Sequence, residues 1–117
     1  MKKIYYLSTC DTCRKIIERL GGMQDFIKQD IKTEAITAMQ LKEMRDMAGS
    51  YEALFSRRAV KYKEMQLKDK VLEEKDYKRL ILEEYTFLKR PVIISDKHIF
   101  IGNEERNVTA AEQIIKK

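Results

Sequence analysis

Two cysteines stand three positions apart near the start of the chain, in the stretch Ser8-Thr9-Cys10-Asp11-Thr12-Cys13-Arg14-Lys15. A C-x-x-C pair where a strand turns into a helix is typical of thiol-disulfide chemistry. The first N–H groups of a helix are unpaired and its N-terminus carries about half a positive charge, so it stabilises a thiolate. We therefore expect the pKa of the Cys10 thiol to be lowered and Cys10 to be the attacking nucleophile. Cys13, one turn further along the same face, would resolve the mixed disulfide that forms on Cys10.

The cysteine pair has two other interpretations. The pair could form half of a zinc site, but zinc needs about four ligands, and the chain has no third cysteine and only one histidine, His98. Two inert buried cysteines are the other alternative, but the strand-to-helix junction favours redox chemistry. We expect no metal, and we expect His98 to be an exposed residue near a turn, since no partner for it is recognisable nearby.

A strand has to precede the cysteines and a helix has to follow them. The apolar run Ile4-Tyr5-Tyr6-Leu7 predicts the strand, and Gly21-Gly22 predicts the end of the helix. Between them apolar side chains recur at helical spacing, at Cys13, Ile16, Ile17 and Leu20. Residues 24–31 predict a second strand, which is parallel to the first because a helix crosses over between the two.

The middle of the chain, from about residue 33 to 88, is predicted to be helical. An amphipathic segment there is capped by Thr37 or Thr33 and ended by Gly49. A further helix is expected over residues 77–88, where apolar residues recur three and four positions apart. We interpret residues 33–88 as an insertion in a single domain that covers all 117 residues.

Strand patterns return after the helical segment. Pro91, the only proline, stands directly before the run Val92-Ile93-Ile94-Ser95, where a proline can begin a strand but not occupy its middle. Asp96-Lys97 predicts a two-residue hairpin turn into a strand over residues 98–102.

The last predicted element is a short helix that Thr109-Ala110-Ala111-Glu112 would cap and that would bury Ile114 and Ile115. The order β-α-β, helices, β-β-α matches an α/β, thioredoxin-like fold with a helical insertion and a small mixed four-stranded sheet. In that fold a proline at the start of the third strand, usually with a cis peptide bond, faces the C-x-x-C helix end. We therefore expect the bond before Pro91 to be cis.

Composition restricts the class of protein. Hydrophobic residues make up 44% and charged residues 37%, no apolar run approaches a membrane span, and the first residues lead into a strand instead of a signal peptide. We expect a cytoplasmic protein with no membrane partner, in which a Cys10–Cys13 disulfide would be transient. Basic and acidic residues are mixed, so the net charge of +5 favours a field around an anionic substrate or thiolate over direct nucleic-acid binding.

Three separated motifs give the chain a resemblance to a known family. They are Cys10-x-x-Cys13-Arg14-Lys15, the arginine-containing segment Leu54 to Met65, and Lys89-Arg90-Pro91-Val92-Ile93. In this order they resemble the arsenate reductase, Spx and YffB group of thioredoxin-like proteins, and the resemblance covers essentially the whole chain.

The resemblance also implies which residues bind substrate. It makes Arg14 and Arg90 anion-binding residues beside Pro91, and it matches a third arginine to Arg57 or Arg58, of which the spacing within the segment favours Arg58. Guanidinium groups are permanently charged forks that hold an oxyanion or a carboxylate with two hydrogen bonds and stabilise a thiolate.

Two classes of function follow from the resemblance. The first is a thiol-disulfide reductase without a bound cofactor, in which Cys10 attacks an arsenate-like oxyanion or a glutathione mixed disulfide, Cys13 resolves, and glutathione, glutaredoxin or thioredoxin supplies electrons. Arsenate reductases resemble one another in a further arginine shortly after the last hairpin, and this chain has no basic residue in the corresponding stretch Ile99-Phe100-Ile101-Gly102. This departure counts against arsenate as the substrate. The alternative is an Spx-like redox-switched transcriptional regulator that binds the RNA polymerase alpha subunit.

Overall fold

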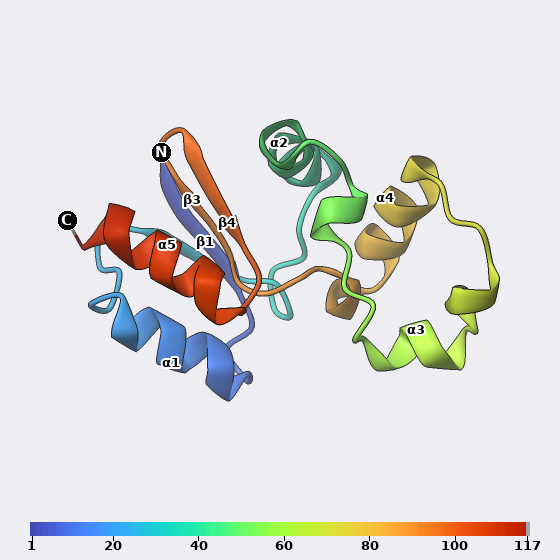
Figure 1. The fold of residues 1–117 in the computed structure, drawn as a ribbon, viewed down its shortest axis with the longest axis horizontal. Helices are drawn as coiled ribbons and strands as arrows, with labels where there is room; N and C mark the ends of the chain where they lie inside the picture. Colours follow the sequence, from blue (N-terminus) through green and yellow to red (C-terminus); the bar gives the residue numbers. More distant parts are fainter. Residues whose placement is uncertain (117) are drawn as a thin grey trace. The chain divides into compact units, whose positions relative to one another are not determined.

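The chain forms two compact units in the computed structural model, which describes residues 1–116 (Figure 1). The sheet unit contains residues 1–35 and the chain from Arg90 onward, and the helical unit is the continuous segment 36–89. Along the chain, the helical unit therefore interrupts the sheet unit between its second and third strands. No helix within residues 1–116 is long and apolar enough to cross a membrane.

The sheet unit is built on a mixed four-stranded sheet in the order β2-β1-β3-β4. Strand β1 (Lys2–Tyr6) pairs parallel with β2 (Ile27–Asp30) and antiparallel with β3 (Val92–Ser95). Strand β4 (His98–Ile101) is antiparallel to β3 across the predicted Asp96-Lys97 turn. The predicted order of elements and the thioredoxin-like fold are confirmed.

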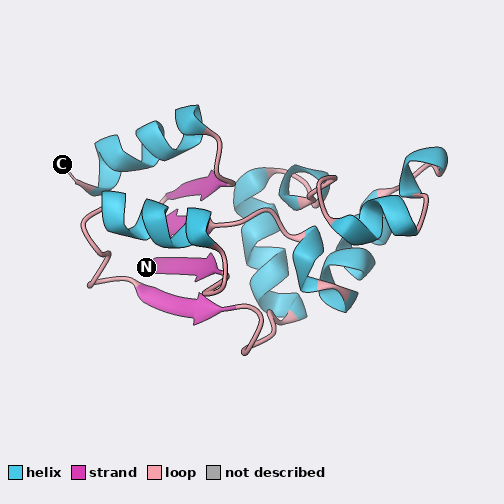
Figure 2. Ribbon diagram, turned by 90° about the horizontal axis from the view of Figure 1, so that it is seen from below, coloured by secondary structure: helices cyan, strands magenta, loops and turns pink. Residues whose placement is uncertain are grey.

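Helices α1 (Asp11–Arg19) and α5 (Glu105–Ile115) lie side by side on one face of this sheet (Figures 1 and 2). Their apolar faces and the sheet residues that point toward them form a single buried cluster of Ile4, Ile16, Leu20, Met23, Phe26, Ile93, Phe100, Val108 and Ala111. Burial of this apolar surface fixes the position of α1, the helix that carries the cysteines.

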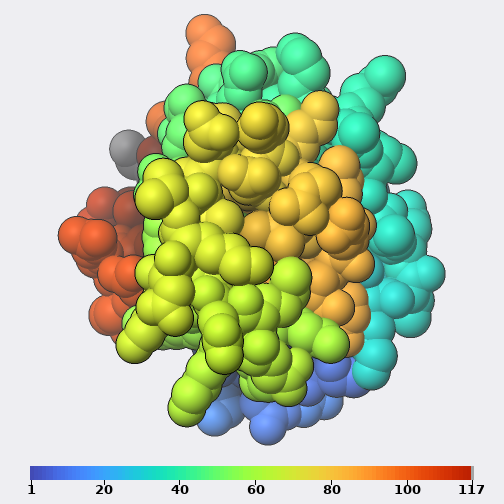
Figure 3. All heavy atoms as spheres, turned by 90° about the vertical axis from the view of Figure 1, so that its right-hand side faces the viewer, coloured from blue at the N-terminus to red at the C-terminus, as the bar shows by residue number. Residues whose placement is uncertain are grey.

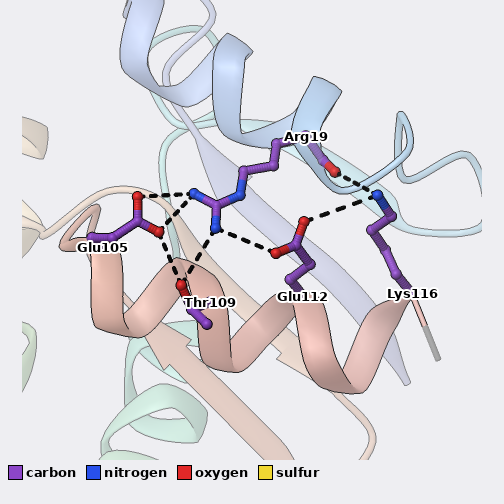
Figure 4. Close-up of polar contacts among 5 residues, drawn as sticks. All are labelled: Arg19, Glu105, Thr109, Glu112 and Lys116. Atoms are coloured by element: carbon purple, nitrogen blue, oxygen red, sulfur yellow. Dashed lines mark hydrogen bonds and ion pairs between the residues drawn. The ribbon is translucent and has the colours of Figure 1, made fainter.

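Polar contacts join the C-terminal end of α1 to α5 (Figure 4). The Arg19 guanidinium forms ion pairs of 2.8 Å with Glu105 and 3.3 Å with Glu112, and it donates to the Thr109 hydroxyl at 3.3 Å. The Lys116 ammonium donates to the backbone oxygen of Arg19 at 3.3 Å. These contacts hold the two helices together at the end of α1 that lies away from the cysteines.

The start of α5 differs from the prediction. The helix begins at Glu105 after Glu104, and the hydroxyl of Thr109 donates to the Glu105 carboxylate one turn inside the helix, so the predicted cap at Thr109 is wrong. The same side-chain types satisfy a capping pattern and an interior hydrogen bond, and the sequence pattern does not separate them. Burial of Ile114 is also wrong, because this side chain is 38% exposed, whereas Ile115 packs partly against the core.

The helical unit begins with α2 (Ala38–Ala48), whose ends follow the predicted signals. The hydroxyl of Thr37 accepts from the N–H of Gln40, and the Gln40 side chain accepts from the N–H of Thr37, which makes a capping box. Gly49 ends the helix with φ of 98°, a left-handed conformation that glycine adopts without strain.

The other helices of this unit are short. They are the 3-10 helices η1 (Glu52–Leu54), η2 (Leu67–Asp69) and η3 (Tyr85–Phe87) and the α-helices α3 (Val60–Glu64) and α4 (Glu74–Glu83). The helix predicted over residues 77–88 thus begins earlier and ends at Glu83. The apolar pattern continues past that end because Phe87 in η3 and Leu88 directly after it are both buried, while the backbone of Glu84 is already extended.

An aromatic cluster forms the core of the helical unit. The fully buried ring of Phe55 stacks on Phe87 at 5.0 Å between centroids and meets Tyr77 edge-on at 4.9 Å. Helix α3, by contrast, buries none of its residues. Figure 3 shows the yellow-green segment around α3 on the surface of the molecule.

Candidate active site

Cys10 lies at the point where the β1–α1 loop becomes helix α1. It is the N-cap residue with extended backbone angles, φ −95° and ψ 114°, and its carbonyl accepts from the N–H of Arg14 at 3.2 Å. Its own N–H donates to the backbone oxygen of Leu7 at 3.0 Å, which closes the loop into a tight turn. The predicted strand-to-helix junction is confirmed.

The surroundings of the half-buried Cys10 sulfur favour its thiolate. Partial burial raises the pKa of Cys10, but hydrogen bonds from the N–H and the thiol of Cys13 and from the N–H of Thr12 lower it. The positive charge of Arg90 lowers it further, and the net result is a pKa below the ordinary value. The N–H groups involved are those that the first turn of a helix leaves unpaired.

Cys13 has the opposite character. Its side chain is fully buried, and this burial, together with the nearby charge of Cys10, raises the pKa of Cys13 to about 11. A hydrogen bond from the Leu7 backbone and the charge of Arg90 offset only part of that rise. The pair therefore combines a half-buried sulfur at Cys10, whose thiolate form is favoured, with a buried thiol at Cys13 that keeps its proton to a higher pH.

Three of the other predicted site residues belong to the sheet unit with the cysteines. Arg14 is 62% exposed and forms an ion pair with Asp11 on the first turn of α1. Arg90 precedes Pro91, and the peptide bond between them is cis, as expected. Pro91 is buried, and its carbonyl accepts from the N–H of Gly102 at 2.8 Å.

Arg57 and Arg58 belong to the helical unit and differ in their contacts. Arg57 donates to Glu52 at 2.9 Å and to the Tyr77 hydroxyl at 3.0 Å, so its guanidinium serves the packing of that unit. The exposed guanidinium of Arg58 has no hydrogen bond or ion pair to any of residues 1–116. This difference agrees with the choice of Arg58, whose part in binding an anion stays a prediction.

His98 takes no part in this site. Its side chain is exposed at the start of β4 and stacks on Phe100 at 6.1 Å between ring centroids, so the expectation of a surface histidine is confirmed. Within the described part of the chain, no group of three histidine, cysteine, aspartate or glutamate side chains is arranged to hold a metal ion.

Asp30, next to the β1–α1 loop, is a residue that the sequence patterns did not single out. The Asp30 carboxylate accepts from the Ser8 hydroxyl, from the Ser8 N–H at 3.4 Å and from the Lys32 N–H at 3.2 Å. The hydrogen bond from the Ser8 hydroxyl is the main cause that keeps the pKa of Asp30 below its ordinary value. The available signal was topological, because the carboxyl ends of parallel neighbours such as β1 and β2 meet at one edge of the sheet.

Comparisons with known proteins place this site in context. The global transcriptional regulator Spx 2 of Bacillus cereus is 26% identical over 108 residues, which cover 90% of this chain and 82% of that protein. The global transcriptional regulator Spx of Bacillus subtilis is 24% identical over 110 residues, which cover 92% of this chain and 84% of the relative.

Solved structures share the fold. A putative ArsC family related protein from Bacteroides fragilis has a TM-score of 0.77 at 20% identity and covers 93% of this chain and 95% of its own. An arsenate reductase from Vibrio cholerae has the same TM-score at 18% identity, with 97% and 96% covered. The model of the ArsC family matches residues 5–111, a range that contains both cysteines and all three motifs. The chain therefore belongs to the ArsC family.

Proposed function

We propose that this protein is a cytoplasmic thiol-disulfide reductase in which Cys10 is the nucleophile and Cys13 the resolving thiol. The observation that carries the proposal is the asymmetry of the pair: one half-buried sulfur with a lowered pKa, and one buried sulfur with a pKa of about 11. An attacking thiol needs thiolate character and access, and only Cys10 has both.

With a glutathione mixed disulfide, the Cys10 thiolate attacks the glutathione sulfur, and the target leaves as a thiolate that takes a proton from solvent. Cys13 then gives up its proton to solvent and attacks the Cys10 sulfur, which expels glutathione as a thiolate. The cysteine pair loses two electrons, and the mixed disulfide becomes two thiols. Reduced glutathione or thioredoxin returns the pair to the dithiol state.

The arginines are proposed to bind the anionic part of the substrate. Arg90 already acts electrostatically on the Cys10 sulfur, and Arg14 stands on the same helical turn as the cysteines. Arg58 would add a third guanidinium for the carboxylates of glutathione or for an arsenate-like oxyanion. Reduction of arsenate to arsenite takes the same two electrons as reduction of a disulfide.

A second candidate function is an Spx-like regulator. Two relatives of this chain, from Bacillus cereus and Bacillus subtilis, are global transcriptional regulators, and the matching residues cover 82% and 84% of their length. In this alternative, oxidation of Cys10 and Cys13 to a disulfide changes the affinity of the protein for the RNA polymerase alpha subunit.

The first test is turnover by the native chain, Cys10→Ser and Cys13→Ser with a glutathionylated peptide or arsenate as substrate. Glutathione with glutaredoxin, and thioredoxin with its reductase, serve as alternative electron donors. We expect turnover by the native chain and none by Cys10→Ser. Cys13→Ser should accumulate a Cys10–glutathione adduct, visible in the intact mass.

Arg90→Ala should raise KM for the anionic substrate, and Arg106→Ala is the matched control because its side chain is 89% exposed. A native chain without turnover on either substrate would refute the reductase. Redox-dependent capture of the purified RNA polymerase alpha subunit by such an inactive chain would support the regulator.

A further inference from the structure

Hydrogen bonds join the loop between β1 and α1, which carries Cys10, to the end of the neighbouring strand β2. We propose that Asp30 is a positioning residue for Cys10, and that it acts through Ser8 on the loop between β1 and α1. The inference builds on the proposed function, since it concerns how the reacting thiol is kept in place. Asp30 does not itself touch the reacting atoms.

Asp30 is anchored well enough to serve this purpose. It is the last residue of β2 and lies opposite Tyr6, the last residue of β1. Its backbone oxygen accepts from the N–H groups of Thr33 at 3.2 Å and Glu34 at 2.8 Å. These two hydrogen bonds fix the turn that follows β2 against Asp30. The carboxylate therefore projects from a fixed point at the edge of the sheet.

Two of the three hydrogen bonds to the Asp30 carboxylate come from Ser8, one from its backbone N–H and one from its hydroxyl. A carboxylate that accepts two hydrogen bonds from one residue fixes that residue in orientation as well as in position. Two residues further on, the N–H of Cys10 is held by the Leu7 carbonyl. The loop is thus tied across to β2 at Ser8 and closed on itself at Cys10.

The position of this loop decides how well the Cys10 sulfur meets its donors. The N–H groups of Thr12 and Cys13 belong to helix α1, whereas Cys10 is the last residue of the loop. Hydrogen bonds to a thiolate weaken steeply when the sulfur shifts, and reactive groups have to be held within about 0.5 Å of their working positions. Loss of the Ser8–Asp30 contact should therefore reduce the fraction of Cys10 present as thiolate.

The experiment is a double-mutant cycle with Ser8→Ala, Asp30→Ala and the double variant in the full chain. Iodoacetamide alkylation of Cys10 is followed by intact mass from pH 4 to about 9, where Cys13 stays protonated. We expect Ser8→Ala to raise the midpoint by about 0.5–1 pH unit, which is about a three- to tenfold lower rate below the midpoint. The cycle separates the Ser8–Asp30 contact from the direct effect of the Asp30 charge. Asp30→Ala and the double variant both lack this charge, so the difference between them reports the effect of Ser8 alone.

Two further variants separate positioning from general destabilisation. Ser8→Thr keeps the hydroxyl and should keep the native midpoint. Thr9→Ala removes the neighbouring exposed hydroxyl, which has no side-chain hydrogen bond to residues 1–116, and should also leave the midpoint unchanged. Thermal unfolding of every variant shows whether it is folded at the assay temperature.

The inference is supported if Ser8→Ala shifts the midpoint in the native chain but not in the Asp30→Ala background. Equal shifts in both backgrounds, or no shift in a folded Ser8→Ala protein, would overturn it while the proposed function stands. An ordinary thiol midpoint in the native chain would instead refute the proposed function, and the inference with it.

Discussion

The sharpest prediction concerns how Cys13 controls the pKa of Cys10. The Cys13 thiol and the Cys13 N–H both donate to the Cys10 sulfur, and a substitution changes only the first of these bonds. Cys13→Ala removes the side-chain donor, whereas Cys13→Ser supplies a stronger one in the same place. The two variants therefore differ mainly in a single hydrogen bond to the thiolate.

A hydrogen bond to a charged group contributes about 1.5–3 kcal/mol, and a thiol is a weak donor, so we take a value near the low end. Since one pKa unit equals about 1.4 kcal/mol, Cys13→Ala should raise the Cys10 pKa by about one unit. Cys13→Ser should leave it at or below the native value. The backbone donors keep the pKa of the alanine variant from rising further.

The assay is the pH dependence of iodoacetamide alkylation, which is unambiguous here because each variant retains one cysteine. The rate at a pH below both midpoints should be about tenfold lower in Cys13→Ala than in Cys13→Ser. Equal midpoints in two folded variants would show that the side chain at position 13 does not contribute to the Cys10 pKa. The donor role of the Cys13 thiol would then be refuted.

Three predictions concern stability. Because burial raises the pKa of Cys13 from its ordinary 9.0 to about 11, the unfolded chain loses this proton first, and the free energy of unfolding should fall as pH rises from about 9 to 11. The free energy of unfolding of Cys13→Ser, measured by urea titration, should fall less over this pH range. An equal fall in the variant and the native chain would count against a buried thiol at Cys13 as the cause. Phe55→Ala should cost about 3–5 kcal/mol in urea unfolding, because it empties the centre of the aromatic cluster, while the 94% exposed Val71→Ala should stay within about 0.5 kcal/mol. A similar cost for both would contradict the described core. Arg19→Ala should lower the Tm by a few degrees, and by more than Arg106→Ala, because Arg19 joins two helices; the reverse order in a thermal melt would argue against that role.

The features that the sequence predicted well depend on local signals. The C-x-x-C junction, the Thr37 cap and the Gly49 end of α2 each follow from a few adjacent residues whose conformational preferences agree with the fold. The cis bond before Pro91 was predicted from the order of the elements, because this order puts the proline at the start of the third strand. Helix boundaries without a unique signal were less predictable, as with the start of α5 at Glu105.

Contacts between distant segments were beyond the sequence patterns. Ser8 and Asp30 are 22 residues apart, and Arg19 and Glu112 are 93 apart. Only the pairing of strands and the packing of helices bring such residues together, and no local propensity encodes them. The binding roles of the arginines have the same origin and stay predictions until a ligand is tested.

The pairing of β1 with β3 also has a consequence during synthesis on the ribosome. Strand β1 ends at Tyr6, but its antiparallel partner begins at Val92, so the sheet unit stays incomplete until the 85 residues between them have been made. An isolated helix of nine residues is marginal in water, and α1 lacks its partners on β3, β4 and α5 until then. In the nascent chain, Cys10 therefore lacks the stable helix N–H groups and the charge of Arg90 that lower its pKa until the residues of β3, β4 and α5 have been added.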